Sequence, residues 1–208
     1  MKSTKLDNDK YYTPIDLAKE CIDKTFEIIG KENITEIIEP SAGNGSFSNQ
    51  IANCIAYDLV PESDNIKTAD FLDMKLGYKS GRLFIGNPPF GVHNKLVVDF
   101  YDKCCDCGDY IAFILPISCY KNDIQLYKFD LIYSEDLGLR YYTDRELHCC
   151  FNIYRRPASG AFNLKPNYEL NEITIIEHRR KKVIIKLQPI KKLKMDIVMQ
   201  CVIGEMVV

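Results

Sequence analysis

The sequence of 208 residues contains no apolar run approaching twenty residues and no charged-then-apolar leader. A membrane-spanning helix needs about 20 consecutive apolar residues, and a secretory signal needs such a leader, so we expect neither. Internal repeats and low-complexity tracts are also absent, which excludes a repeat architecture. Nine cysteines without an export signal indicate free thiols in a reducing, intracellular setting.

Cysteine is abundant, but the paired spacing of a zinc site is missing. Cys104-Cys105-x-Cys107 is expected at a helix end, and His148-Cys149-Cys150 is expected on a core strand. We therefore expect no bound metal. With 46% hydrophobic residues, the chain is long enough for one sizeable core and short for two.

The stretch Asn87–Phe90 reads Asn-Pro-Pro-Phe and follows the apolar run Leu83–Ile85. An exocyclic amine on adenine or cytosine, or an amide nitrogen, is a poor nucleophile because its lone pair is conjugated. The Asn87 side-chain oxygen and the Pro88 carbonyl can accept its two N–H bonds, and the two prolines hold that carbonyl in place. Phe90 offers a face on which a planar ring can stack. The stretch indicates methylation of a planar amino nitrogen, although a Pro-rich turn after a strand explains it equally well when taken alone.

A strand, a glycine-containing turn and a helix are predicted upstream, over Ile37–Glu39, Pro40–Phe47 and Ser48–Ile55. An α/β sheet binds nucleotide-like ligands at such a turn. The turn contains neither Gly-x-Gly-x-x-Gly nor the Gly-Lys-Ser/Thr of a phosphate loop. Its glycines let a ligand approach the backbone closely. The acid Glu39 suits a cationic, amino-bearing ligand better than a pyrophosphate.

Two further acids follow the turn. Asp58 ends the next apolar run about twenty residues later, where an acid binds ribose hydroxyls in nucleotide-binding folds. Asp70 offers a carboxylate for an adenine amino group, and Phe71 offers an aromatic ring to cover the adenine.

Three motifs carry a family resemblance: Glu-Pro-Ser-Ala-Gly-Asn-Gly-Ser-Phe at 39–47, Ala-Asp-Phe-Leu at 69–72 and Asn-Pro-Pro-Phe at 87–90. In this order they resemble the S-adenosylmethionine-dependent adenine-N6 methyltransferases. Tyr-Tyr-Thr-Pro at 11–14 is similar to the Thr-Pro element with which the γ-group DNA enzymes begin. The resemblance runs from Tyr11 to Pro157. It implies an α/β, Rossmann-like class I fold with a mixed, mostly parallel sheet, and S-adenosylmethionine as the cofactor.

The resemblance also assigns roles to residues. Residues implied in cofactor binding are Tyr11, Thr13, Pro14, Glu39, Ser41, Gly43, Gly45, Asp58, Asp70, Phe71 and Asn87. Residues implied in holding the target base are Asn87, Pro88, Pro89 and Phe90. In the γ-group an aromatic residue of a later strand stacks on the other face of the base. Tyr154 is our candidate, with Phe151 as the alternative, although simple core packing explains both rings too.

Apolar spacing predicts the remaining elements of a catalytic domain at residues 1–158 and of a β-rich extension at residues 159–208, packed on or beside the core. We expect a helix at His93–Cys107 and strands at Asp109–Pro116, Leu147–Tyr154, Ile173–Ile176, Val183–Leu187 and Ile197–Met199.

Charge is uneven, although the net charge is only −2. Residues 155–194 carry eleven bases and three acids, a net charge of +8. Such a basic segment fits contact with a phosphate backbone, and solvated lysines on amphipathic strands explain it too. The candidate backbone-contacting residues are Arg155, Arg156, Arg179, Arg180, Lys181 and Lys182.

The resemblance predicts direct methyl transfer from S-adenosylmethionine to adenine N6 in DNA. The γ-group enzymes carry a substantial recognition domain after the core, whereas only the fifty residues 159–208 remain here. The short extension, a partner subunit, or recognition of a structured RNA by its shape are three open explanations. An RNA adenine methyltransferase and a non-catalytic methyltransferase-fold subunit stand as alternatives. A protein-glutamine methyltransferase fits less well, because those enzymes prefer Tyr as the fourth residue of the motif.

Overall fold

The computed structural model describes residues 11–122, 124–143, 145–166, 173–177 and 183–187. The chain forms two compact units, Met1–Lys165 and Pro166–Val208. In the second unit, strands β8 (Ile173–Glu177) and β9 (Val183–Leu187) form an antiparallel pair, where the sequence predicts strands. The predicted strand at Ile197–Met199 and the basic residues 179–182 lie outside the described residues.

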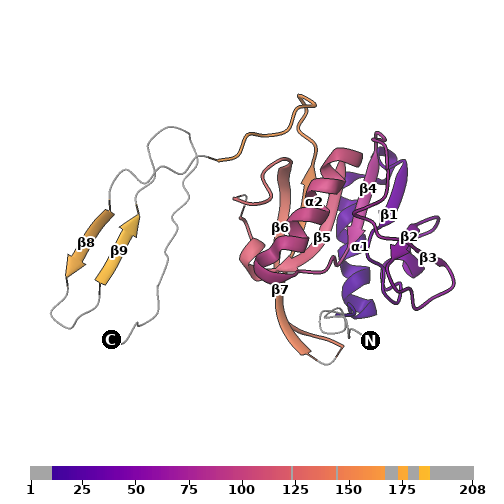
Figure 1. Ribbon diagram of the computed structural model, residues 1–208, viewed down its shortest axis with the longest axis horizontal. Helices are drawn as coiled ribbons and strands as arrows, with labels where there is room; N and C mark the ends of the chain where they lie inside the picture. Colours follow the sequence, from indigo (N-terminus) through magenta and orange to yellow (C-terminus); the bar gives the residue numbers. More distant parts are fainter. Residues whose placement is uncertain (1–10, 123, 144, 167–172, 178–182, 188–208) are drawn as a thin grey trace. The chain divides into compact units, whose positions relative to one another are not determined.

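The first unit is built on a seven-stranded sheet with the strand order β3-β2-β1-β4-β5-β7-β6 (Figure 1). All neighbouring strands are parallel except those that pair with β7, which is antiparallel to both β5 and β6. The predicted α/β fold with a mixed, mostly parallel sheet is therefore confirmed. Its strands are β1 (Glu36–Glu39), β2 (Ile55–Asp58), β3 (Ile66–Thr68), β4 (Arg82–Gly86), β5 (Tyr110–Pro116), β6 (Asp130–Tyr142) and β7 (Arg145–Arg155).

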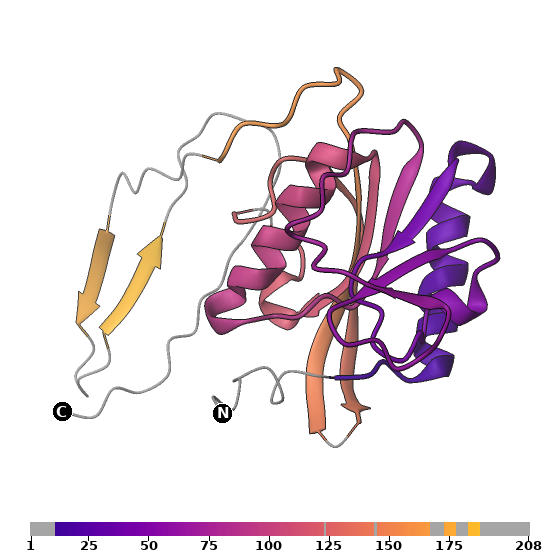
Figure 2. The ribbon, with the colours of Figure 1, turned by 45° about the vertical axis from the view of Figure 1, so that its right-hand side comes forward.

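Two α-helices cover opposite faces of this sheet, as Figure 2 shows. Helix α1 (Ile15–Ile29) packs with the alternate strand residues Ala112 and Ile114 in one apolar cluster. Helix α2 (Lys95–Cys107) packs with Phe113 and Leu115 in the other. The alternation along β5 follows from the pleat of a strand, which sends successive side chains to opposite faces. Neither helix of the described residues is long and apolar enough to cross a membrane.

The connection from β1 to β2 differs from the prediction. A helix is expected over Ser48–Ile55, but only one 3₁₀ turn forms, at Ser48–Gln50. Ile51 is already extended (φ −117°, ψ 118°), and Asn53 takes a left-handed φ of 60°. The reason is the sheet register: Ile55 pairs with Ile38, so the chain must turn back into β2 before a second helical turn can form.

The end of β7 is fastened by Arg156. Its guanidinium donates to the Asp109 carboxylate (2.9 Å) and to the carbonyls of Gly108 (2.8 Å) and Cys105. It also lies 4.9 Å from the centre of the Phe129 ring and 5.2 Å from that of Phe162. These contacts satisfy the guanidinium within the protein. The assignment of Arg156 to a phosphate is therefore revised: this residue holds the fold together.

Arg155, its neighbour, is exposed and lies at the amino end of β5, where it pairs with Tyr110. Two of the residues that follow, Phe162 and Asn163, also contact the first unit. The Asn163 amide donates to the Lys128 carbonyl at 2.9 Å, and the Phe162 ring lies 6.1 Å from that of Phe129.

Replacing Arg156 should expose its structural role. Arg156→Ala leaves the Asp109 carboxylate, whose side chain is only 16% exposed, without its cation. We expect the free energy of unfolding to fall by about 3 kcal/mol, the range for breaking a largely buried ion pair. Urea denaturation measures this loss. Arg155→Ala is the matched control and should change stability by less than about 0.5 kcal/mol. Equal stability of the two variants would contradict the anchoring role.

Candidate functional site

The motif residues meet at one edge of the sheet. Strands β1, β2 and β4 run parallel, so Glu39, Asp58 and Gly86 end them at the same carboxyl edge. β1 lies between β2 and β4, and the chain order reverses at this point. Open α/β sheets bind ligands in the crevice at such a switch point. The glycine turn and Asn87, which are far apart in sequence, are therefore brought together by the topology.

The glycine turn is closed by Asp58. The Gly43 amide donates to one carboxylate oxygen of Asp58 at 2.7 Å, and the Val60 amide donates to the other at 2.8 Å. Gly43 and Gly45 have φ of 54° and 83°, a region that residues with a side chain rarely adopt. Each carboxylate oxygen keeps a further lone pair. Asp58 can therefore hold the turn and still accept a ligand hydroxyl.

Glu39 is buried at the centre of this edge, with 2% of its surface exposed. Its carboxylate accepts the Ser48 amide at 2.8 Å, and it lies against Gly86, where an added Cβ would come within 3.3 Å of the Glu39 side chain. Burial raises the pKa of Glu39 to about 8, a shift that the hydrogen bonds from Ser48 and Phe47 oppose. Glu39 is thus largely protonated at neutral pH, a state that a cation placed beside it would reverse.

The orientation of the Asn87 side-chain amide is fixed by its hydrogen bonds. Its amide nitrogen donates to the Thr13 hydroxyl oxygen at 3.2 Å and lies 3.4 Å from the Tyr11 carbonyl oxygen. A carbonyl can only accept, so the nitrogen and not the oxygen must face this segment. The Asn87 side-chain oxygen is buried and has no hydrogen-bond partner among the residues that the structure describes. A buried acceptor without a donor is costly, so this oxygen can take a hydrogen bond from the N–H group of a ligand.

The rest of the Asn-Pro-Pro-Phe motif frames this oxygen. Pro88 is buried, and Pro89 and Phe90 are half-buried. The Phe90 ring touches both apolar clusters, so it sits where the sheet ends. After it the chain takes positive φ values at Gly91 (67°) and His93 (54°), an unusual run that can occur at functional sites.

The predicted Thr-Pro element crosses the site as a strap, residues 11–14. The Thr13 carbonyl accepts the Ser46 hydroxyl at 2.8 Å, and the Tyr12 amide donates to the Thr143 hydroxyl at 2.9 Å. The Tyr12 ring rests on the glycine turn, where a Cβ on Gly43 would lie 3.0 Å from it. The strap thus joins the glycine turn, Asn87 and the hairpin of β6 and β7. The contacts of Ser46 and Thr143 were not predicted: Ser46 belongs to the motif at 39–47 but was assigned no role, and Thr143 belongs to no motif.

Asp70 and Phe71, both predicted to contact the adenine, lie in different environments. Asp70 is exposed beyond β3 and accepts the Leu72 amide at 2.9 Å. Phe71 is only 2% exposed, with its ring stacked on Phe100 and edge-on to Phe84, at centroid distances of 5.6 and 5.7 Å. Asp70 is therefore available to a ligand, whereas the faces of the Phe71 ring belong to the core. The predicted covering of an adenine by Phe71 is revised accordingly.

Tyr154 does not reach the site. It is fully buried and pairs with Ile111, near the amino end of β5 and far from the carboxyl edge. Its hydroxyl accepts the Asn152 amide at 2.8 Å, and its ring lies edge-on to Tyr101 at 5.1 Å. Phe151, the alternative, is also buried in the core. The base-stacking role predicted for this strand is therefore corrected.

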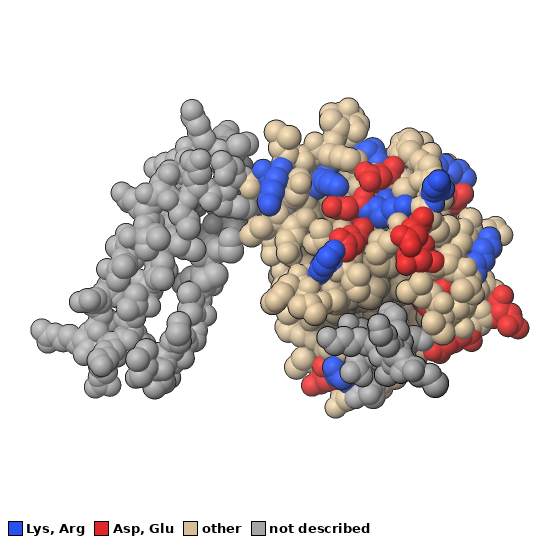
Figure 3. All heavy atoms as spheres, in the orientation of Figure 1, with Lys and Arg blue, Asp and Glu red and all other residues tan. Residues whose placement is uncertain are grey.

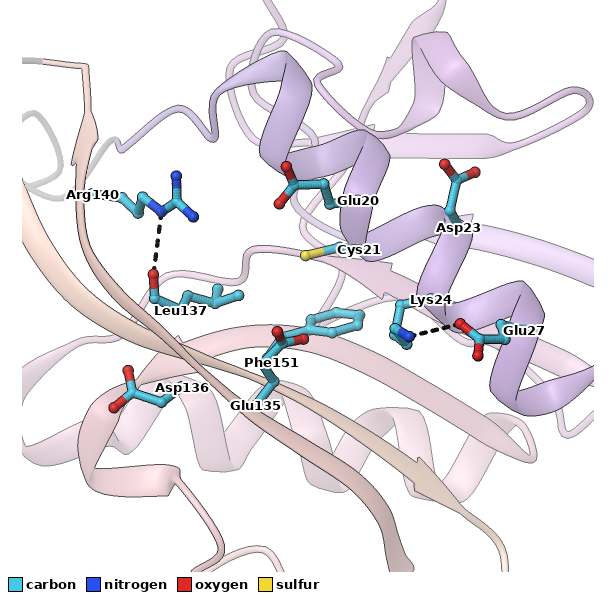
Figure 4. Close-up of a pocket in the computed structure, with 10 residues that line it drawn as sticks. All are labelled: Glu20, Cys21, Asp23, Lys24, Glu27, Glu135, Asp136, Leu137, Arg140 and Phe151. Carbon is cyan, nitrogen blue, oxygen red and sulfur yellow. Dashed lines mark hydrogen bonds and ion pairs between the residues drawn. The ribbon is translucent and has the colours of Figure 1, made fainter.

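A hollow of about 430 Å³ lies elsewhere, between α1 and β6 (Figure 4). Acidic side chains from both elements line it, among them Glu20, Glu27 and Glu135, and Lys24 is bound to Glu27 at 2.6 Å. None of the motif residues lines this hollow. Among the described residues, no group of three or more His, Cys, Asp or Glu side chains is arranged to hold a metal ion.

Comparison with known proteins supports the fold. No family model matches the sequence, and no curated protein matches it. Among solved structures, a candidate RNA methyltransferase from Pyrococcus horikoshii is 15% identical, with a TM-score of 0.57 over 74% of this chain and 90% of that one. A candidate class I S-adenosylmethionine-dependent methyltransferase from Listeria monocytogenes is 14% identical, with a TM-score of 0.55 over 81% and 67%. The chain has the Rossmann-like class I methyltransferase fold.

Glu39 should leave a signature in the pH dependence of stability. In the folded protein it keeps its proton up to a pH of about 8, whereas its ordinary pKa is 4.5. Between these values the folded state binds more protons than the unfolded chain, so Glu39 makes stability fall as pH rises. We expect Glu39→Gln to flatten this fall. Urea denaturation of both proteins across this window measures the difference, and parallel curves would contradict the raised pKa.

Proposed function

We propose that this chain transfers a methyl group from S-adenosylmethionine to the N6 amino group of adenine in DNA. The observation that supports this most is the buried, unpartnered side-chain oxygen of Asn87. An adenine amino group brings N–H donors of the kind that this oxygen lacks. Bonds from that amine to Asn87 and to the Pro88 carbonyl would draw its nitrogen out of conjugation.

The residues at the switch point fit the cofactor. Gly43 and Gly45 give the turn its shape: both have positive φ, and a Cβ would come within 3.0 Å of Tyr12 at Gly43 and within 2.6 Å of Asn49 at Gly45. Asp58 can accept ribose hydroxyls, and the exposed carboxylate of Asp70 can accept an adenine amino group. Glu39 lies where the positive amino acid end of the cofactor would restore its negative charge. From the resemblance, Thr13, Pro14 and Ser41 complete this set.

Methyl transfer then requires the protein mainly to position the amine and the methyl group. S-adenosylmethionine supplies an electrophilic methyl group. The adenine nitrogen forms a bond to the methyl carbon as the carbon–sulfur bond breaks, and the electron pair remains on the sulfur. The alkylated nitrogen is cationic and gives up a proton to solvent. Asn87 holds the amine in line, and Phe90 stacks on the base, which offsets part of the few kcal/mol needed to extrude it.

RNA is the second candidate substrate. The Pyrococcus horikoshii protein of similar fold is described as a candidate RNA methyltransferase. Recognition of a folded RNA by shape requires fewer base-specific contacts than recognition of a DNA sequence. A partner subunit that supplies recognition is a further possibility that the same assay addresses, because the chain alone would then be inactive on both.

Asn87→Ala tests the function. We expect the rate of methyl transfer to fall by about 100-fold or more, the cost of losing one preorganised polar contact to the reacting group. S-adenosylmethionine affinity, measured by calorimetry, should stay near that of the wild type. Transfer of labelled methyl to duplex DNA, single-stranded DNA and RNA is measured, with N6-methyladenine identified after hydrolysis.

A control variant separates the effect of losing the Asn87 oxygen, which polarises the amine, from the effect of weakening the strap. Ser46→Ala removes the hydroxyl that donates to the Thr13 carbonyl of the strap and leaves both contacts of the Asn87 amide nitrogen in place. Its loss of activity should be much smaller than that of Asn87→Ala. If Asn87→Ala keeps more than about a tenth of wild-type turnover, the polarising role is wrong.

The basic tail gives a separate prediction. Arg179, Arg180, Lys181 and Lys182 lie outside the described residues and are proposed to contact phosphates. Replacing all four by Ala should weaken binding of every sequence about equally. It should also flatten the slope of log affinity against log salt by up to roughly three, since each phosphate contact contributes about 0.7–0.9. Cofactor affinity should not change. An unchanged slope would mean that these four side chains are only solvated.

A further inference from the structure

The hairpin of β6 and β7 is longer than the sheet that carries it. β5 ends at Pro116, which pairs with Cys149, whereas β6 and β7 continue to pair as far as Tyr142 and Arg145. Residues 139–142 and 145–148, which we call the ribbon, therefore extend past the end of β5 as a two-stranded structure. Figures 1 and 2 show the ribbon projecting beyond the sheet, next to the start of the described chain. Because β7 runs against β5, this is the carboxyl edge, where Asn87 lies.

A β-bulge sets the direction in which the ribbon extends. The register shifts between Asp136 and Gly138, and Gly138 has a left-handed φ of 68°. The Asp136 carboxylate accepts the Gly138 amide at 2.8 Å and pairs with His148 at 2.7 Å. Bulges bend a strand and increase its twist, and they are enriched beside active sites. The base of the ribbon is thus built to a defined direction.

The ribbon is also fixed to the candidate site. Arg145 donates to the Tyr11 hydroxyl at 3.0 Å, and its guanidinium lies 5.4 Å from the centre of the Tyr11 ring. The Tyr11 carbonyl in turn lies 3.4 Å from the amide nitrogen of Asn87. A chain of contacts therefore runs from Arg145 on the ribbon through Tyr11 to Asn87, the residue proposed to hold the target amine.

The exposed side chains of the ribbon include apolar, aromatic and cationic groups, and also the acid Glu146, which pairs with Tyr141. Leu139 and Tyr141 are 62% and 69% exposed, on one face. Arg140 and Arg145 are exposed on the other face, and no carboxylate of the described residues lies within 4.0 Å of either guanidinium. Elsewhere on the first unit, the view in Figure 3 shows acidic and basic side chains interspersed, without a continuous basic patch.

We infer that the ribbon contacts the nucleic-acid strand that carries the target base, with Tyr141 against a base and Arg145 against a phosphate. This inference rests on the proposed function. A two-stranded ribbon is narrow enough to enter a nucleic-acid groove, where the face with Tyr141 can stack on a base and the opposite face, with Arg145, can meet a phosphate. The ribbon then supplies the second wall of the substrate site, which Tyr154 cannot provide from the core.

Titration of labelled oligonucleotides at several salt concentrations tests this inference. Short single-stranded DNA, duplex DNA and RNA of the same sequence are the probes. Tyr141→Ala should raise the Kd of the preferred probe by about fivefold or more, the lower limit for one base stack. Tyr141→Phe keeps the ring and should restore wild-type binding. Arg145→Ala should flatten the salt slope by about 0.7–0.9, the value for one phosphate.

Two controls keep the outcome decisive. Lys31→Ala removes an exposed cation that precedes the amino end of β1, at the opposite edge of the sheet, and should leave both Kd and salt slope unchanged. S-adenosylmethionine affinity reports whether each ribbon variant is folded. Wild-type Kd and slope in Tyr141→Ala and Arg145→Ala would overturn the inference, as would the absence of binding to all three probes. If the ribbon variants bind weakly but the wild type methylates none of the probes, the proposed function is wrong and the ribbon contact stands.

Discussion

The candidate site depends on how the amide of Asn87 is oriented. Its nitrogen is directed toward the strap by the Tyr11 carbonyl and the Thr13 hydroxyl, at 3.4 and 3.2 Å. The side-chain oxygen must then point the other way, where it is buried without a donor. An amide free to rotate would lose this bias, and the unsatisfied acceptor would turn toward water. The strap therefore does more than bind a ligand, because it fixes which atom of Asn87 the substrate meets.

The acids at the ends of the neighbouring strands β1 and β2 lie in different environments. Asp58 is held by two backbone amides and remains half-exposed, whereas Glu39 is buried beside Gly86 and has a raised pKa of about 8. Burial thus keeps a proton on Glu39 at the end of β1. A cationic ligand would bring Glu39 back to its charged form, so ligand binding and release of a proton from this residue are coupled.

The sequence allowed the fold and the edge residues to be predicted, because they depend on local patterns. Apolar runs place β4 and β5, and the motifs follow strand ends directly in the chain. The helix at Ser48–Ile55 was wrong, because its length is limited by the pairing of Ile55 with Ile38, and a local pattern does not contain that register. Ser46 and Thr143 were missed for a similar reason: their partners, Thr13 and Tyr12, are distant in sequence.

Tyr154 and Arg156 show why residue type alone misleads on a long antiparallel strand. β7 enters the sheet at the site and leaves it at the opposite edge, so the residues near its end lie farthest from Asn87. There Tyr154 packs in the core and Arg156 binds the Asp109 carboxylate, so both side chains are fully engaged within the protein. The same polarity places the first residues of β7, including Arg145, beside the site. Substrate contacts on this strand are therefore to be sought at its beginning, where it overhangs the sheet.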